Sequence, residues 1–261
     1  MFIILSAILL ISVKAAPVPD ELVGEYGDKF EGDMLLTEKQ KLAINNAIQS
    51  RNGLKNDTLR WPNRTVVYHI EEDDFDDEEI EVILGGLSEL SNKSCVEFRA
   101  REGNEYAVII ESSANGCFSS VGFSKGDHED GINQVLNLGK GCIRQGVVIH
   151  EMLHTLGFYH MQSTYDRDDF VKIVWENIAS GHEHNFEMYK NDTVTDFGVP
   201  YDYGSVMHYS EHAFSKNGEK TIIPLQENVK IGQRDALSVS DIEKLNKMYC
   251  TDENLARVPL K

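Results

Sequence analysis

The spacing of apolar residues predicts a helix, a strand and a second helix in the N-terminal third of the chain. Residues 37–50 carry apolar positions at helical intervals, and Thr37 with Gln40 fits a capping box at their start. Thr65–Ile70 is rich in β-branched and aromatic residues, which predicts a strand. An acidic run over 71–81 suits the start of a helix, where acids complement the helix dipole. The apolar positions of this second helix are Ile80, Ile83, Leu84, Leu87 and Leu90.

The remaining two thirds of the chain also mix strand-like and helix-like segments. Tyr106–Ile110 reads as a strand and Val147–Leu156 as a helix. Near the C-terminus, Ser240 and Glu243 fit another capping box, which predicts a short helix with Ile242 and Leu245 facing the core. The pattern contains no internal repeat and no low-complexity linker.

The ends of the chain differ in composition from its centre. Met1–Val13 is apolar, almost uncharged and shorter than the roughly 20 residues of a membrane-spanning helix. Small residues follow, so we interpret this segment as a secretory signal; a buried N-terminal core segment is the alternative. A further region ends at Arg51-Asn52-Gly53, which reads as an exposed cleavage point. The expected divisions are a signal peptide over 1–15, a propeptide over 16–51, a main domain over 52–250 and a loose tail over 251–261.

Charge and cysteine content narrow the possible partners and the compartment. The net charge of −18 argues against nucleic acid and anionic membranes as partners, because both would repel the chain. An even number of cysteines in a secreted chain predicts two disulfides, with three possible pairings of Cys95, Cys117, Cys142 and Cys250. Sequons that fit secretion and mark candidate N-glycosylation sites occur at Asn56, Asn63, Asn92 and Asn191.

The segment 150–160 carries the chemistry. His150 and His154 are four residues apart, so a helix places both imidazoles on one face within reach of one metal ion. Gly157 can adopt the left-handed conformation that ends the helix, after which His160 returns as a third ligand. Three neutral imidazoles and a water form an open tetrahedral site, which is typical of catalytic zinc. The sequence therefore predicts one Zn²⁺ per chain.

A carboxylate beside this site predicts a hydrolytic function. Bound zinc lowers the pKa of water to about 7, and Glu151 lies next to the first histidine of the motif. We expect Glu151 to take a proton from the attacking water and to deliver it to the departing amine. The alternative, three unrelated histidines, leaves the shared spacing of these residues unexplained.

The complete motif has the HExxHxxGxxH pattern of the metzincins. Its flanks narrow the resemblance, because Gly157-Phe158-Tyr159-His160, Asp166-Arg167-Asp168 and Ser205-Val206-Met207-His208-Tyr209 resemble the astacin family of zinc endopeptidases. The resemblance covers roughly residues 30 to 250. It implies an α+β catalytic domain of two lobes, with the zinc on the floor of the cleft between them, preceded by a short propeptide.

The resemblance also implies roles for residues outside the histidine motif. Met207 would lie in a turn beneath the histidines, and Tyr209 would stabilise the oxyanion. Phe30-Glu31-Gly32-Asp33 resembles the FxGD motif of family propeptides, in which the aspartate binds the zinc in place of water and keeps the zymogen silent. The family disulfides would correspond to Cys95–Cys250 and Cys117–Cys142. By the same analogy, extended peptides would add a strand to a sheet edge near Cys117–Val121.

Two positions depart from the family pattern. Family members usually have a glutamate after the third histidine, and it receives the new N-terminal ammonium after activation; here the residue is Met161. The arginine that usually precedes the Asp166 segment is replaced by Thr164. Neither change removes a zinc ligand, but a methionine cannot form the ion pair. We therefore expect activity to depend less on the identity of the trimmed N-terminus.

These features favour a secreted, monomeric zinc endopeptidase that is made as a zymogen and acts on proteins or peptides. The alternative is a secreted protein of the same fold that binds zinc with little or no proteolytic activity. Met161 and Thr164 agree with that alternative, whereas the intact set of Glu151 and three histidines favours the enzyme.

Overall fold

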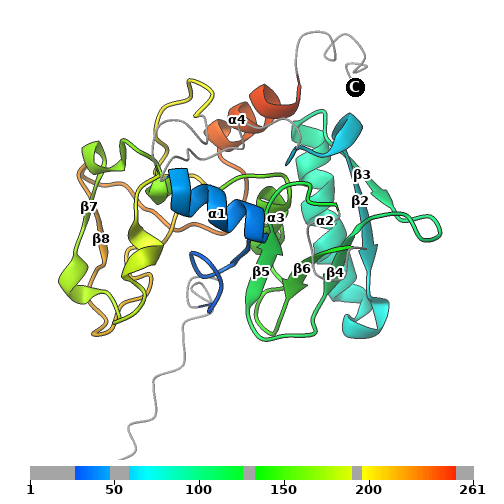
Figure 1. Cartoon of the computed structure of the whole chain (residues 1–261), viewed down its shortest axis with the longest axis horizontal. Coiled ribbons are helices and arrows are strands. Elements are labelled where there is room, and N and C mark those ends of the chain that lie inside the picture. Colours follow the sequence, from blue (N-terminus) through cyan, green and yellow to red (C-terminus); the bar gives the residue numbers. More distant parts are fainter. Residues whose placement is uncertain (1–26, 48–58, 126–132, 190–195, 251–261) are drawn as a thin grey trace, which may run out of the picture.

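The chain folds around a six-stranded sheet and a two-stranded sheet (Figure 1). The computed structural model describes residues 27–47, 59–125, 133–189 and 196–250. The large sheet has the order β1-β5-β6-β4-β2-β3, and all its neighbours are parallel except β5 and β6. Its strands are β1 (Met34–Leu35), β2 (Thr65–Ile70), β3 (Glu97–Ala100), β4 (Val108–Glu111), β5 (Cys117–Ser120) and β6 (Gln134–Leu138).

Helices α2 and α3 pack together beside this sheet, and both contribute to the first core, the larger of the two hydrophobic cores. The helices of the described chain are α1 (Glu38–Ala47), α2 (Asp77–Lys93), α3 (Gln145–Thr155) and α4 (Val239–Tyr249). Helix α2 buries Ile83, Leu87 and Leu90. A side chain at Gly86 would lie 2.8 Å from a methyl group of Val148, so this glycine lets α2 and α3 approach closely. Helix α3 is consequently enclosed and can hold polar groups away from water.

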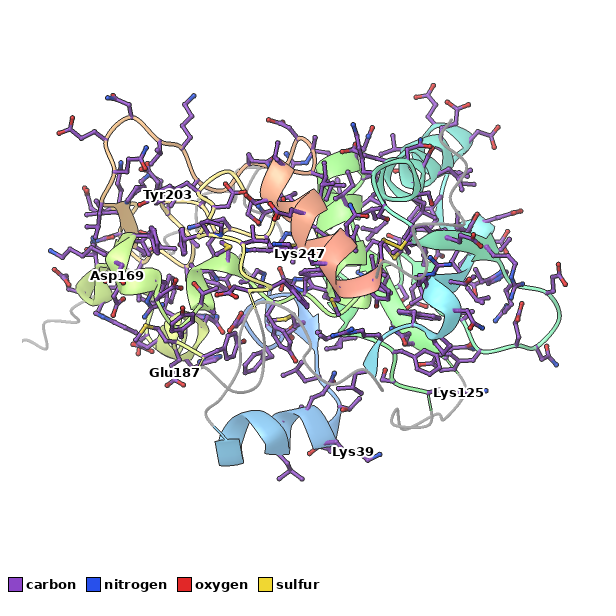
Figure 2. All side chains as sticks on the ribbon, turned by 90° about the horizontal axis from the view of Figure 1, so that it is seen from above. Lys39, Lys125, Asp169, Glu187, Tyr203 and Lys247 are labelled. Atoms are coloured by element: carbon purple, nitrogen blue, oxygen red, sulfur yellow. A yellow bond between two sulfur atoms is a disulfide. The ribbon has the colours of Figure 1, made fainter. Side chains whose placement is uncertain are left out.

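A second, smaller core forms around strands β7 (Val171–Ile173) and β8 (Ile222–Pro224), which pair antiparallel. Phe186 and Phe214 are buried there, together with Tyr209. Figure 2 shows Asp169 and Tyr203 in this part of the molecule and Lys125 on the opposite side. The predicted α+β fold class is therefore confirmed. No helix among the described residues has the length and apolarity to cross a membrane.

Most of the predicted elements occur, and where the prediction and the structure differ, the difference has a local cause. Strand β2 has the predicted bounds, and the Thr37–Gln40 capping box is present at the start of α1. Helix α4 begins two residues earlier than predicted, because Ser238 and Asp241 form its capping box. Leu84 of α2 is 41% exposed and does not join the core.

Candidate zinc centre

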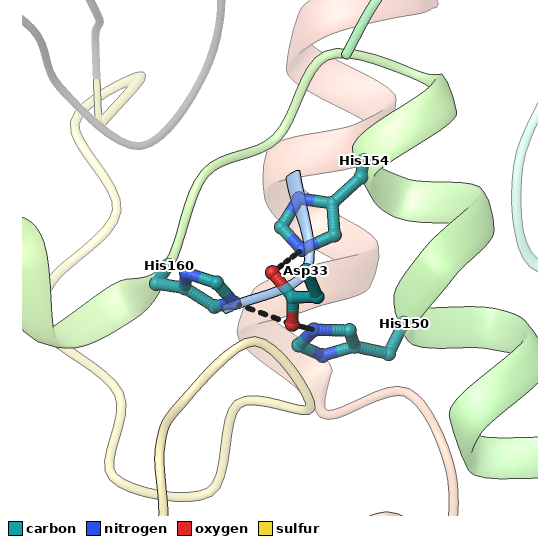
Figure 3. A group of neighbouring side chains, drawn as sticks. All are labelled: Asp33, His150, His154 and His160. Atoms are coloured by element: carbon teal, nitrogen blue, oxygen red, sulfur yellow. Dashed lines mark hydrogen bonds and ion pairs between the residues drawn. The ribbon is translucent and has the colours of Figure 1, made fainter. Parts of the chain in front are cut away.

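Helix α3 brings two imidazoles to the same point. His150 and His154 are one turn apart, and every residue of α3 from Gly146 to Thr155 is buried. Their Nε2 atoms lie 3.2 Å and 3.3 Å from the carboxylate oxygens of Asp33 (Figure 3). The two ligands predicted from the spacing are thus positioned by the helix itself.

The end of α3 redirects the chain and supplies the third imidazole. Gly157 has a φ of 101°, which residues with a side chain rarely adopt. Its N–H donates to the His154 carbonyl at 2.8 Å, and the Phe158 N–H donates to the Leu153 carbonyl at 2.9 Å, which is a Schellman motif. The chain then returns, and the Nε2 atom of His160 lies 3.2 Å from the same carboxylate (Figure 3).

Each of the three imidazoles also has an oxygen partner at its other nitrogen. Such a partner fixes the tautomer, so that Nε2 is left to bind a metal ion. Two of the partners are backbone carbonyls and the third is a carboxylate. The pairs are His150 Nδ1 with the Val206 carbonyl at 2.8 Å, His154 Nδ1 with the Phe158 carbonyl at 2.7 Å, and His160 Nδ1 with Glu31 Oε2 at 2.8 Å.

The donor set fits zinc. One ligand atom from each of Asp33, His150, His154 and His160 lies within 4.8 Å of the others, and all four residues are buried. Burial disfavours the charged form of Asp33, but the facing histidines outweigh it and hold the pKa of Asp33 well below its usual value. Asp33 Oδ1 and His154 Nε2 face each other at 3.3 Å, but neither forms a hydrogen bond within the described chain. A metal ion between them would satisfy both buried groups.

Glu151 follows His150 on α3 and is buried near enough to Asp33 to feel its charge. It is fully buried, and neither of its carboxylate oxygens has a hydrogen-bond partner within the described ranges. Burial, reinforced by the charge of Asp33, raises the pKa of Glu151 well above its usual value. A carboxylate with a raised pKa can both accept and return a proton near neutral pH.

Tyr209 reaches the centre from the second core. Its ring lies 4.6 Å from the ring of His160, centroid to centroid, and its hydroxyl donates to the Glu31 carbonyl at 2.5 Å. The side chain of Gln162 holds the Tyr209 backbone through a 3.0 Å hydrogen bond to its N–H. The hydroxyl therefore already contacts a peptide carbonyl beside the histidines.

The turn around Met207 lies in the first core, supports the site and is held by α4. Met207 is buried, and its carbonyl accepts the Met161 N–H at 2.9 Å. Asp241 of α4 accepts both the Ser205 hydroxyl at 2.6 Å and the Val206 N–H at 2.9 Å. Because the Val206 carbonyl is the partner of the first histidine, α4 helps to fix that ligand.

The segment that carries Asp33 also covers the edge of the large sheet. Strand β1 pairs in parallel with β5, with Met34 opposite Ser119. The Ser119 N–H donates to the Asp33 carbonyl at 2.8 Å, and the Val121 N–H donates to the Leu35 carbonyl at 3.3 Å. The edge that the sequence suggested for peptide binding is thus occupied by the chain's own N-terminal region.

Comparison with known proteins agrees with this geometry. The family model for Astacin, a family of peptidases, matches residues 53–250. The chain belongs to the astacin family. It is therefore a zinc metallopeptidase, a hydrolase that acts on peptide bonds.

Three known proteins show how similar this chain is to other proteins in sequence and structure. Seminal metalloprotease 1 of Drosophila melanogaster is 43% identical over 211 residues, which cover 78% of this chain and 84% of the relative. Zinc metalloproteinase nas-4 of Caenorhabditis elegans is 35% identical over 232 residues, covering 88% and 70% respectively. The structure of High choriolytic enzyme 1, a hatching enzyme zinc-protease of Oryzias latipes, matches with a TM-score of 0.67 and 34% identity, covering 76% of this chain and 98% of that one.

The two residues that depart from the family pattern, Met161 and Thr164, are both buried. The Met161 sulfur accepts a hydrogen bond from the Lys244 ammonium group at 3.1 Å. Lys244 is only 2% exposed, and burial lowers its pKa, against the opposing effect of Asp241. An ammonium group from the body of the protein thus already lies next to Met161.

Some of the remaining sequence predictions concern residues that the structure describes, and others do not. The disulfides are Cys95–Cys250 and Cys117–Cys142. Asn63 and Asn92 are exposed. The predictions that lie outside the described residues are the signal peptide over 1–15, the cleavage point at 51–53, Asn56, Asn191 and the tail over 251–261.

Three residues of the site were not predicted from the sequence. They lie far from the histidine motif along the chain but contact a zinc-ligand candidate or one of its partners in the fold. Glu31 was visible only as the variable position of the FxGD motif. Tyr189, whose hydroxyl donates to Glu31 Oε1, gave no signal. Asp241 could have been found as the fourth residue of a capping box that starts at Ser238.

Proposed function

We propose that this chain is the secreted precursor of a zinc endopeptidase that its own N-terminal segment keeps latent. One observation carries the proposal: within the described part of the chain, three imidazoles meet in a buried site that Asp33 closes, and the carboxylate of Glu151, next to His150 on α3, is buried without a hydrogen-bond partner. Astacin-family relatives named zinc metalloproteinases support the same reaction. His150, His154 and His160 would hold the zinc through Nε2.

Glu151 is the proposed general base and acid of this reaction. When bound, zinc supplies a Lewis acid that polarises a carbonyl and lowers the pKa of water to about 7. Glu151 accepts a proton from the attacking water while the water oxygen bonds to the scissile carbonyl carbon. It then gives that proton to the amine nitrogen as the carbon–nitrogen bond breaks.

Tyr209 is the proposed oxyanion donor. In the precursor its hydroxyl is bound by the Glu31 carbonyl, at a distance of 2.5 Å. Removal of the N-terminal segment frees this hydroxyl for the carbonyl oxygen of a substrate. Losing such a donor typically costs about 10²–10³ in rate.

Latency rests on two blocks in the same segment. Asp33 takes the ligand position that the attacking water needs, since its oxygens lie within 3.3 Å of all three histidines. Strand β1 takes the sheet edge at β5, where we expect extended substrates to bind. Cleavage near Arg51 would let both blocks leave together, because both precede that residue.

We extend the proposal to processing and location. The signal peptide is placed at 1–15, the propeptide at 16–51, the catalytic domain at 52–250 and a tail at 251–261. The disulfides support an oxidising compartment and therefore secretion. We propose that the secreted enzyme is a monomer that acts on proteins or peptides, with no membrane or nucleic-acid partner.

The test compares wild-type protein with Glu151→Gln after trimming at Arg51. Wild type should cleave a fluorogenic peptide and stop when a chelator removes zinc, while the untrimmed precursor stays silent. Glu151→Gln should retain about one zinc per chain by metal analysis but lose cleavage. Glu97→Gln, an exposed acid of β3, is the matched control and should cleave normally. A wild-type protein that holds zinc but cleaves nothing would instead support the non-catalytic alternative.

A further inference from the structure

The third zinc ligand differs from the other two in the origin of its hydrogen-bond partner. The partners of His150 and His154 are carbonyls of the catalytic region. The partner of His160 is the carboxylate of Glu31, which lies before the proposed cleavage point. Trimming therefore leaves the first two partners in place and removes the third.

Glu31 is fixed in this position by its surroundings. Glu31 as a whole is 1% exposed, and its two carboxylate oxygens face different donors. Oε2 faces His160 Nδ1 at 2.8 Å, and Oε1 accepts the Tyr189 hydroxyl. Its backbone has a φ of 44°, in the left-handed region that residues with a side chain adopt infrequently. The turn that the Gly32 N–H closes by donating to the Lys29 carbonyl at 3.0 Å accounts for this φ, and the two side-chain contacts fix the direction of the carboxylate.

The charge of Glu31 also suits the centre. Buried carboxylates need a partner of opposite charge or a metal ion. Asp33 and Glu31 together bring two negative charges to a site that fits a divalent cation. A carboxylate that accepts the second N–H of a metal-binding histidine fixes the ring orientation and makes the imidazole a stronger ligand.

We propose that Glu31 is a positioning residue of the zinc centre, which orients His160 in the precursor and makes the precursor hold zinc more tightly than it otherwise would. The inference rests on the proposed function, because it assumes that the three histidines bind zinc. It adds a second task to the N-terminal segment. Besides blocking the site, this segment completes the environment of the third ligand.

Glu31→Gln in the full-length precursor is the first test. Glutamine has nearly the same size but only one oxygen acceptor, so it cannot serve both His160 and Tyr189. Zinc-loaded precursors are mixed with an excess of a colorimetric chelator, and the rate of zinc transfer is measured. We expect transfer about 10- to 100-fold faster from Glu31→Gln than from wild type, the usual effect of losing such a partner. Glu38→Gln changes an exposed acid in the same segment and should match wild type.

Tyr189→Phe provides a second test that separates positioning from general structural damage. This change removes the hydroxyl that holds Glu31 but leaves Glu31 itself in place. It should speed zinc release from the precursor and leave release from the trimmed enzyme unchanged, because Glu31 is gone there. The visible spectrum of cobalt-substituted precursor should change in both Glu31→Gln and Tyr189→Phe, since the third ligand loses its orientation.

The outcomes distinguish this inference from the proposed function. Release from Glu31→Gln at the wild-type rate would overturn the inference, as would equal acceleration by Tyr189→Phe in both forms. A wild-type precursor that binds no zinc would instead overturn the proposed function.

Discussion

Replacing Tyr209 with Phe tests the oxyanion assignment directly. The change removes one oxygen atom, and the ring keeps its contact with His160. In the precursor the hydroxyl donates to the Glu31 carbonyl at 2.5 Å, so it can reach a peptide carbonyl beside the histidines without rearrangement of the fold. In the trimmed enzyme the same hydroxyl should act on the substrate carbonyl as negative charge develops on it.

The expected loss follows from the kind of bond that is removed. A donor that acts mainly in the transition state contributes about 2.7–4 kcal/mol, so kcat should fall about 10²- to 10³-fold while KM changes little. Kinetics with a fluorogenic peptide measure both constants. In the precursor, losing one neutral hydrogen bond of about 0.5–1.5 kcal/mol should weaken the hold on the N-terminal segment about 2- to 13-fold.

Tyr203→Phe is the matched control for this experiment. Its hydroxyl also donates to a backbone carbonyl, that of Phe170, at 2.6 Å, but in the second core. Any general cost of deleting a tyrosine hydroxyl should therefore appear in both variants. The reasoning is refuted if Tyr209→Phe keeps kcat within about threefold of wild type, or if the two variants lose activity equally.

Three further changes test other contacts. Asp33→Ala should make the precursor cleave peptide, because the ligand position opens; a precursor as silent as wild type contradicts the block. Met161→Glu should raise the free energy of unfolding by about 1.5–3 kcal/mol, since its carboxylate meets Lys244; an unchanged denaturation midpoint argues against this pairing. Asp241→Asn should lower the free energy of unfolding by about 1–3 kcal/mol in a denaturant titration, because an amide nitrogen cannot accept the Val206 N–H. Wild-type stability would disprove that role.

Local patterns predicted the parts of the site that depend on neighbouring residues. The positions of His150 and His154 follow from the helical repeat, and the bend at Gly157 follows from its freedom to adopt a positive φ. Strand β2 was equally predictable, because its residue types favour extended structure. In each case a few adjacent residues determine the conformation.

Contacts between distant segments were not predictable in this way. The pairing of Glu31 with Tyr189 joins residues 158 positions apart, and no periodicity reports it. The sequence predicted a capping box of Ser240 with Glu243 at the start of α4, whereas Ser238 and Asp241 form it. Asp241 also binds the turn that contains Val206, a distant contact that the local pattern does not report. Leu84 has helical spacing with buried neighbours but falls at the margin of the apolar face.

The pairing of β1 with β5 has a consequence for handling and storage of the protein. If the N-terminal segment departs as proposed, the N–H groups of Ser119 and Val121 lose their carbonyl partners and form an open row along the edge of the sheet. A bare rim of this kind can recruit any extended chain, including a second enzyme molecule. The uncut form should therefore resist aggregation at high concentration, because its sheet edge is covered. The trimmed form would expose that edge both to substrates and to other enzyme molecules.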